Sequence, residues 1–67
     1  MTTISTTITN TYRECGRRAA QAMNVRNGSQ FAFERNWLAN ALAHETPDYR
    51  ALAQAAFNAA YRAARKV

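Results

Sequence analysis

The chain has 67 residues and a net charge of +5, which is enough for one small domain and leaves a surplus of basic groups for an acidic partner. Its 15 alanines against two glycines and one proline exclude collagen-like and Pro/Gly-rich low-complexity classes. One cysteine excludes an intramolecular disulfide framework and a zinc site built from several cysteines.

Apolar residues at spacings of three and four predict a first helix over about residues 9–27. They are Ile4, Ile8, Tyr12, Cys15, Ala19, Ala22 and Met23. The Thr-rich start is expected to be loosely structured, with the helix beginning between residues 5 and 11; helix, strand and disorder stay open for residues 1–11. Glu14 precedes Arg18 by four residues, the favourable order for a helical ion pair. Asn27-Gly28 would end this helix, since both residues tolerate the left-handed conformation.

A second helix is expected over about residues 29–44, with Ser29 as its N-cap. Its apolar residues form two neighbouring lines that together make a broad aromatic face. One line holds Phe31, Leu38 and Leu42, and the other holds Phe33, Trp37 and Ala41.

The third helix, over about residues 46–66, has the clearest start. Thr46 is the expected N-cap, Pro47 the first helical residue and Asp48 the acid near the positive end of the dipole. Its apolar face is centred on alanines 53, 56 and 60, which would leave a valley for large side chains. We expect Trp37 and either Phe31 or Phe33 to fill that valley.

These elements predict one all-α domain over residues 1–67. The two architectures that fit are an antiparallel three-helix bundle and a helical hairpin that dimerises. No apolar run approaches the roughly 20 residues of a membrane-spanning helix. The first eleven residues do not follow the pattern of a secretory signal, so we expect a cytoplasmic protein.

Cys15 and His44 are the only nucleophile-and-base pair, and the sequence gives no third group to orient them. Cys15 lies on the apolar stripe, where cysteine acts as a small hydrophobe. Glu34, Glu45 and Asp48 show no spacing typical of paired catalytic carboxylates, and no glycine-rich phosphate loop occurs. We therefore predict a protein that is not an enzyme and that binds no cofactor or metal.

Polar side chains at a spacing of four predict a basic face on the third helix. It consists of Arg50, Gln54, Asn58, Arg62 and Lys66, with Arg65 beside them. Arg13 and Arg17, near Arg18, form a second basic patch on the first helix. Arginine suits contact with carboxylates and phosphates, and Arg, Gln and Asn also read base edges in DNA. The alternative for both patches is an ordinary solvated helix surface.

In its size, its charge imbalance and its lack of a catalytic set, the chain resembles small phage-encoded accessory proteins, including anti-CRISPR inhibitors. The resemblance concerns overall character, so no residue is carried over from it. It implies an inhibitor that caps a protein partner with an acidic or aromatic surface, such as a host defence complex, and blocks it sterically. The alternative is a small basic DNA- or RNA-binding protein acting as a dimer, and homodimerisation stays open for both.

Overall fold

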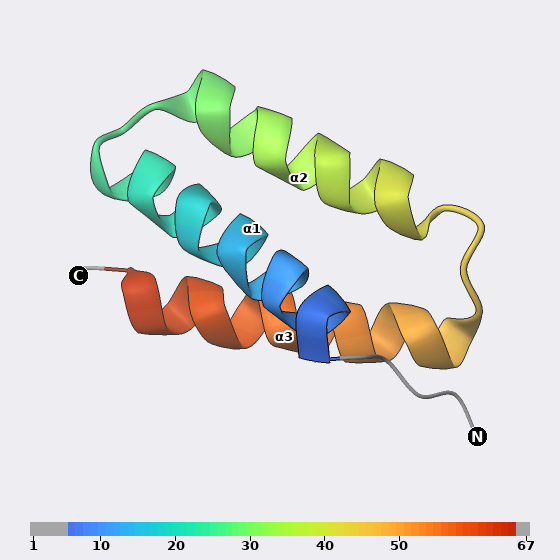
Figure 1. Cartoon of the computed structure of the whole chain (residues 1–67). Helices are drawn as coiled ribbons and strands as arrows, with labels where there is room; N and C mark the ends of the chain where they lie inside the picture. Colours follow the sequence, from blue (N-terminus) through green and yellow to red (C-terminus); the bar gives the residue numbers. More distant parts are fainter. Residues whose placement is uncertain (1–5, 66–67) are drawn as a thin grey trace.

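The computed structural model describes residues 6–65, which form three helices running up, down and up (Figure 1). Helix α1 spans Thr6–Asn24, α2 spans Gly28–Leu42 and α3 spans Pro47–Ala64. The predicted all-α fold is confirmed, as a three-helix bundle. The start of α1 at Thr6 lies within the predicted range, and the expected loose stretch before it falls on residues 1–5, outside the described part of the chain.

Helices α1 and α3 pack side by side and run in the same direction. The hydroxyls of Tyr12 and Tyr49 lie 3.2 Å apart near their N-terminal ends, and Asn24 donates a hydrogen bond of 2.9 Å to the carbonyl of Ala64 at the other end. Between these points Gly16 of α1 lies against the main chain of Phe57 in α3. The other small buried residues of the two helices include Ala19 and Ala20 of α1 and Ala53 and Ala56 of α3. Side chains this small let the two backbones approach closely, and α1–α3 is the most extensive helix pair.

Ala53 and Ala56 of α3 lie in the core together with Ala19 of α1. Phe31 packs against this core, as one of the two expected phenylalanines, whereas the prediction for Trp37 was wrong. Trp37 packs instead against Tyr12, with ring centroids 6.0 Å apart, and stays 37% exposed. Phe33 is 63% exposed. Phe31 also contacts the ring of Tyr61 in α3, with ring centroids 6.2 Å apart. Gly16 decides the outcome, because a residue without a Cβ lets α1 reach the Phe57 backbone.

The turns between the helices match the prediction only in part. Thr46 caps α3 as expected and accepts a hydrogen bond from the Tyr49 N–H at 3.2 Å, with Pro47 as the first helical residue. The N-cap of α2 is Asn27 and not Ser29; its side chain accepts from the Gln30 N–H at 3.1 Å. The left-handed residue after α1 is Arg26, with φ of 58°, so neither Asn27 nor Gly28 plays that part.

The helix ends fall short of the predicted ones. Helix α1 ends at Asn24 and α2 at Leu42, before the expected residues 27 and 44. Helix α3 ends at Ala64, ahead of residue 66. In the connection between α1 and α2, Asn27 is not part of α1 because its side chain caps the N-terminus of α2.

Candidate interaction groove

The backbone of α1 runs close to both α2 and α3, whereas the backbones of α2 and α3 lie farther apart and meet through side chains such as Phe31 and Tyr61. The space between them, on the side away from α1, is an open groove of about 900 Å³, called here the α2–α3 groove. Its lining residues are Phe31, Arg35, Leu38, Ala39, Leu42, Ala43, Pro47, Arg50, Ala51, Gln54, Phe57, Asn58 and Tyr61.

The floor of the α2–α3 groove is apolar. Leu38, Leu42 and Phe57 are buried members of the core whose edges reach the groove. At one end Phe31 contacts Tyr61, with ring centroids 6.2 Å apart, and the α2–α3 turn closes the other end. From Phe31 to residue 43, α2 runs about 18 Å, or roughly three helical turns. The groove is thus a trough of definite length.

The rim of the groove is basic and amide-rich. Arg35 of α2 lies over the ring of Phe31, 5.7 Å from its centroid. Arg50 lines the opposite wall on α3, next to Gln54, which donates a hydrogen bond of 2.9 Å to Asn58. No acidic residue lines the groove, and within residues 6–65 neither arginine forms an ion pair. The two guanidinium groups are available to an incoming anionic group.

The predicted basic face of α3 is divided by the structure. Arg50, Gln54 and Asn58 line the α2–α3 groove together. Arg62 is exposed and lies outside it, and Lys66 falls outside the described residues. Arg65 turns toward α1 and donates a hydrogen bond of 2.7 Å to the Asn24 side chain, which holds the C-terminal ends of α1 and α3 together.

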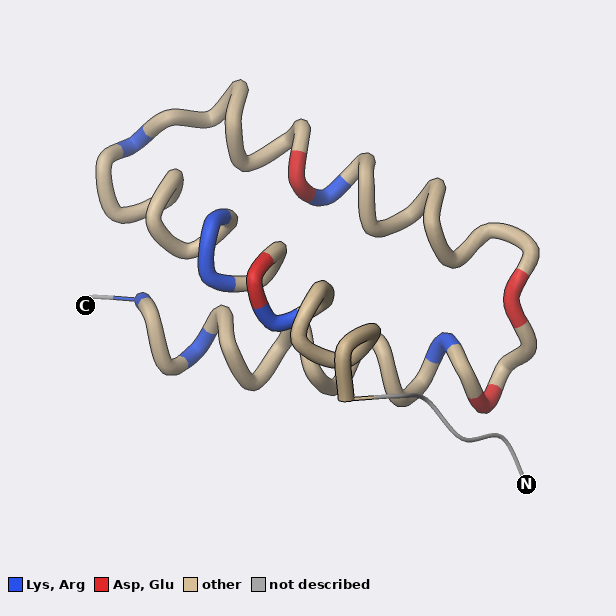
Figure 2. Tube along the Cα trace, viewed as in Figure 1, with Lys and Arg blue, Asp and Glu red and all other residues tan. Residues whose placement is uncertain are grey.

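The second predicted patch does not join the groove. Arg13 donates a hydrogen bond of 3.3 Å to Asn10, and Arg17 forms an ion pair with Glu14, both along α1. Glu14 was expected to pair with Arg18 and does not. Figure 2 shows that the basic residues of α1 lie apart from the α2–α3 turn, beside which Glu45 and Asp48 are found. Arg13 and Arg17 stay a separate, untested candidate surface.

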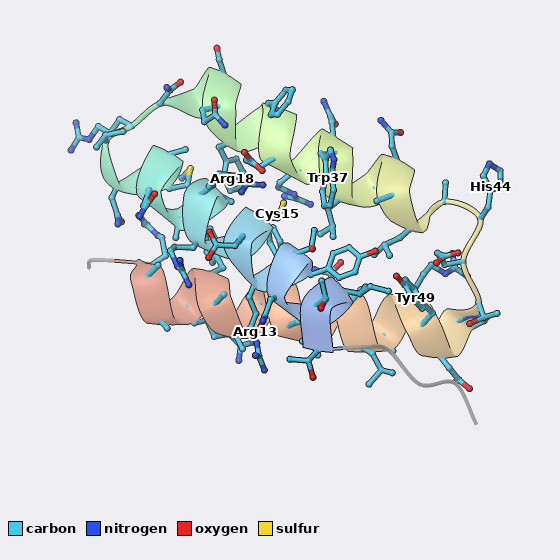
Figure 3. All side chains as sticks on the ribbon, in the orientation of Figure 1. Arg13, Cys15, Arg18, Trp37, His44 and Tyr49 are labelled. Carbon is cyan, nitrogen blue, oxygen red and sulfur yellow. The ribbon has the colours of Figure 1, made fainter. Side chains whose placement is uncertain are left out.

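A polar cluster between α1 and α2 surrounds the buried carboxylate of Glu34, which is 2% exposed. Arg18, whose side chain is 47% exposed, donates from Nε to Glu34 at 2.9 Å, and Gln30 donates to the same carboxylate at 2.9 Å. The Cys15 thiol lies 3.3 Å from the other carboxylate oxygen. Figure 3 shows Cys15 between α1 and α2 and His44 at the α2–α3 turn, so the structure does not bring the thiol and the imidazole together.

The cluster shifts the ionisation of its members in opposite directions. Burial alone would raise the pKa of Glu34, but hydrogen bonds from Arg18, Cys15 and Gln30 outweigh it, and the pKa lies below its ordinary value. Burial, with the hydrogen bond to Glu34, raises the pKa of the Cys15 thiol to about 12. The thiol is therefore a poor nucleophile at neutral pH, and the cluster ties α1 to α2.

Sequence reasoning missed two positions of the candidate site and its surroundings. Arg35 follows Phe31 by four residues, a spacing that places the guanidinium over the ring, and this signal could have linked it to the aromatic face. Glu34 shares the face of Leu38 and Phe31, and a lone acid on an apolar face indicates a buried partner.

Within residues 6–65, no group of three or more histidine, cysteine, aspartate or glutamate side chains could hold a metal ion. None of the helices in this part of the chain is long and apolar enough to cross a membrane. Comparison of the chain with protein-family models, with curated proteins and with solved structures gives no match.

Proposed function

We propose that this chain is a non-enzymatic interaction protein that binds the acidic, partly apolar surface of a protein partner in the α2–α3 groove. The observation that carries the proposal is the composition of that groove. An apolar floor of Leu38, Leu42 and Phe57 is flanked by Arg35 and Arg50, with no acidic residue in the lining.

The two parts of the groove contribute differently to binding. Covering the apolar floor supplies affinity at roughly 25 cal/mol per Å² of apolar area removed from water. The arginines on the rim supply selectivity, since they attract carboxylates and disfavour a basic partner. Aromatic and arginine side chains are also the residues that most often dominate binding energy, and Arg35, Phe31 and Tyr61 bring both kinds to one end of the groove.

Binding in this groove would inhibit the partner by occlusion. A segment held between α2 and α3 has its apolar face covered by the floor and its flanks by the two walls, so the same face cannot contact another molecule. This action needs no chemistry from the inhibitor. The phage-type, anti-CRISPR-like role expected from the overall character of the chain is one setting for it and stays a prediction.

The test uses two arginines of α3 that differ in their position. Partners captured by the wild-type chain are identified by mass spectrometry, produced pure and titrated against Arg50→Glu and Arg62→Glu. Both variants change the net charge equally, but only Arg50 lines the groove. We expect Arg50→Glu to weaken binding at least tenfold and Arg62→Glu to change it less than threefold. Equal effects of the two variants would refute the groove as the binding site.

A second candidate function, binding of DNA or RNA phosphates, is favoured by one observation. The end of the bundle that holds the C-terminal ends of α1 and α3 carries Arg26, Arg62 and Arg65, while Glu45 and Asp48 lie at the opposite end (Figure 2). Phosphate contacts weaken steeply with salt. A titration of duplex and single-stranded nucleic acid at low salt tests this function; absence of binding there removes it, and loss of binding in Arg26→Glu/Arg62→Glu supports it.

A further inference from the structure

The arrangement of the three helices leaves one position of a larger bundle vacant. In a square four-helix bundle each helix contacts two neighbours, and the helices on a diagonal do not touch. Here the backbone of α1 is close to both α2 and α3, whereas the backbones of these two lie farther apart, with side chains such as Phe31 and Tyr61 between them. They therefore occupy diagonal corners, α1 occupies the third, and the α2–α3 groove lies where the fourth helix would run.

We infer that the occupant of the α2–α3 groove is one amphipathic helix of a protein partner, acidic on both flanks of its apolar stripe, which completes a four-helix bundle. This inference rests on the proposed function and specifies the partner. The groove has the right form for a helix, since two nearly antiparallel helical walls enclose an apolar floor about 18 Å long, or about three turns. Ala39 and Ala51 leave room on the two walls for larger side chains of the incoming helix.

The positions of the arginines specify where the acidic residues of the partner lie. Phe31 and Tyr61 face each other and fix the register of the two walls. Arg35 lies four residues from Phe31, about 6 Å along α2, and Arg50 lies eleven residues from Tyr61, about 16 Å along α3. The backbone positions of Arg35 and Arg50 are therefore offset by about 10 Å along the groove, on opposite walls. A helix that pairs with both carries carboxylates on opposite flanks of its apolar stripe at a spacing of about five or six residues, because residues seven apart would share one flank.

Charge argues against the other occupants. A second copy of this chain also carries a net charge of +5, so two copies repel each other. An acidic helix gains from the same field that repels a copy. An extended strand would leave its main-chain hydrogen-bonding groups unpaired, because the described walls are helices whose own main-chain groups are already bonded.

The experiment selects peptides from an unbiased displayed library of 14-residue sequences, with wild-type protein as bait. Counter-selection uses Ala51→Glu, which fills and recharges the groove, and Ala55→Glu is the matched control, since it adds the same charge to an exposed position of α3 outside the groove. We expect enriched peptides with apolar residues at spacings of three and four and acidic residues on both flanks. Their circular dichroism should show helix formation on binding, with affinity lowered at least tenfold by Ala51→Glu and less than threefold by Ala55→Glu.

Three outcomes would overturn the inference: enriched peptides with alternating apolar residues, enrichment that Ala51→Glu does not affect, and no enrichment. Sedimentation of the wild-type chain adds a fourth, because a dimer that Ala51→Glu dissociates would assign the groove to a second copy. The proposed function fails separately. If a purified partner required Arg50 for binding but inserted a loop or a strand into the groove, the proposed function would stand and the inference of a helical occupant would be refuted.

Discussion

Gly16 of α1 lies directly against the main-chain carbonyl of Phe57 in α3, so close that a methyl group at Gly16 would overlap with the carbonyl oxygen. The obstacle is backbone, which cannot rotate aside as a side chain can. This contact sets the separation of α1 and α3, and with it the direction in which α3 presents Arg50 and Phe57 to the groove.

Gly16→Ala should therefore destabilise the fold, although alanine is the better helix former. We expect a loss of about 1–3 kcal/mol in the free energy of unfolding, the usual cost of overpacking. Gly28→Ala is the matched control, because nothing lies within 4 Å of its added Cβ and its φ is not positive. That variant should be neutral or more stable by up to about 1 kcal/mol. Urea unfolding followed by circular dichroism measures both, and a stable Gly16→Ala would contradict the close packing of α1 and α3.

Two phenylalanines distinguish the core from the outer face of α2. Phe57 is 6% exposed and Phe33 is 63% exposed. Phe57→Ala should cost about 3–5 kcal/mol, because it removes a buried ring and leaves a cavity. Phe33→Ala should cost less than about 1 kcal/mol. Thermal unfolding of the two variants compares them directly, and similar melting temperatures would place Phe33 in a packed interface.

Glu34 makes the free energy of unfolding fall as the pH is lowered in the acidic range. Its pKa in the folded state is lowered by the hydrogen bonds it accepts, above all from Arg18, so the unfolded chain binds a proton more readily. The stabilisation is present above the ordinary glutamate pKa of 4.5 and is lost as the pH falls through the lower folded value. Glu34→Gln should cost about 1–3 kcal/mol at pH 7 and flatten the acid dependence.

The matched control for Glu34 is Glu14→Gln, which removes an exposed ion pair with Arg17. Pairs of this kind contribute roughly 0–1 kcal/mol, so this variant should retain the acid dependence of the wild type. Urea midpoints between pH 3 and pH 7 provide the comparison. If Glu14→Gln flattened the profile and Glu34→Gln did not, the role assigned to the buried cluster would be wrong.

Cys15 makes the free energy of unfolding fall with rising pH in the alkaline range. The pKa of its thiol is raised by burial to about 12, from an ordinary value of 9.0. Because the pKa of the thiol is higher in the folded state, the unfolded chain loses this proton at a lower pH than the folded chain does. The contribution of the thiol to the free energy of unfolding is therefore complete below pH 9.0 and is lost as the pH rises toward 12. Stability should fall above pH 9.0, and Cys15→Ala should reduce the slope. Tyr12, whose pKa burial also raises, accounts for the slope that remains.

The burial of Cys15 also predicts its reactivity. With an exposed fraction of 0%, the thiol should not react with a chromogenic disulfide reagent at pH 8 in the native state, and it should react fully in denaturant. The rate of native labelling then reports the opening of the bundle. Stoichiometric labelling of the folded protein within seconds would show that α1 and α2 do not hold Cys15 as described.

The amino-acid sequence by itself determined the three helices and most of the buried stripe of α1. A period of three and four residues is a local property, and it places Tyr12, Cys15 and Ala19 on one face whatever that face meets. The start of α3 was also local, because Thr46 and Pro47 satisfy the helix end through neighbouring atoms. The N-cap of α2 was predicted incorrectly. Asn27 and Ser29 are both favourable N-cap residues, and only the path of the chain between α1 and α2 selects Asn27.

Tertiary structure alone decided which helix faces meet. An apolar pattern defines the buried face of each helix but does not say which helix covers it. The pairing depends on how closely two backbones can approach, and Gly16 together with the alanines of α3 allows α1 and α3 the closest approach. That choice leaves α2 and α3 apart. As a result, Arg50 lines the groove and Arg62 does not, although the spacing of four residues places both on one face of α3. Arg35 of α2 also lines the groove, because the lining depends on the space between two helices and not on the residue spacing within one helix.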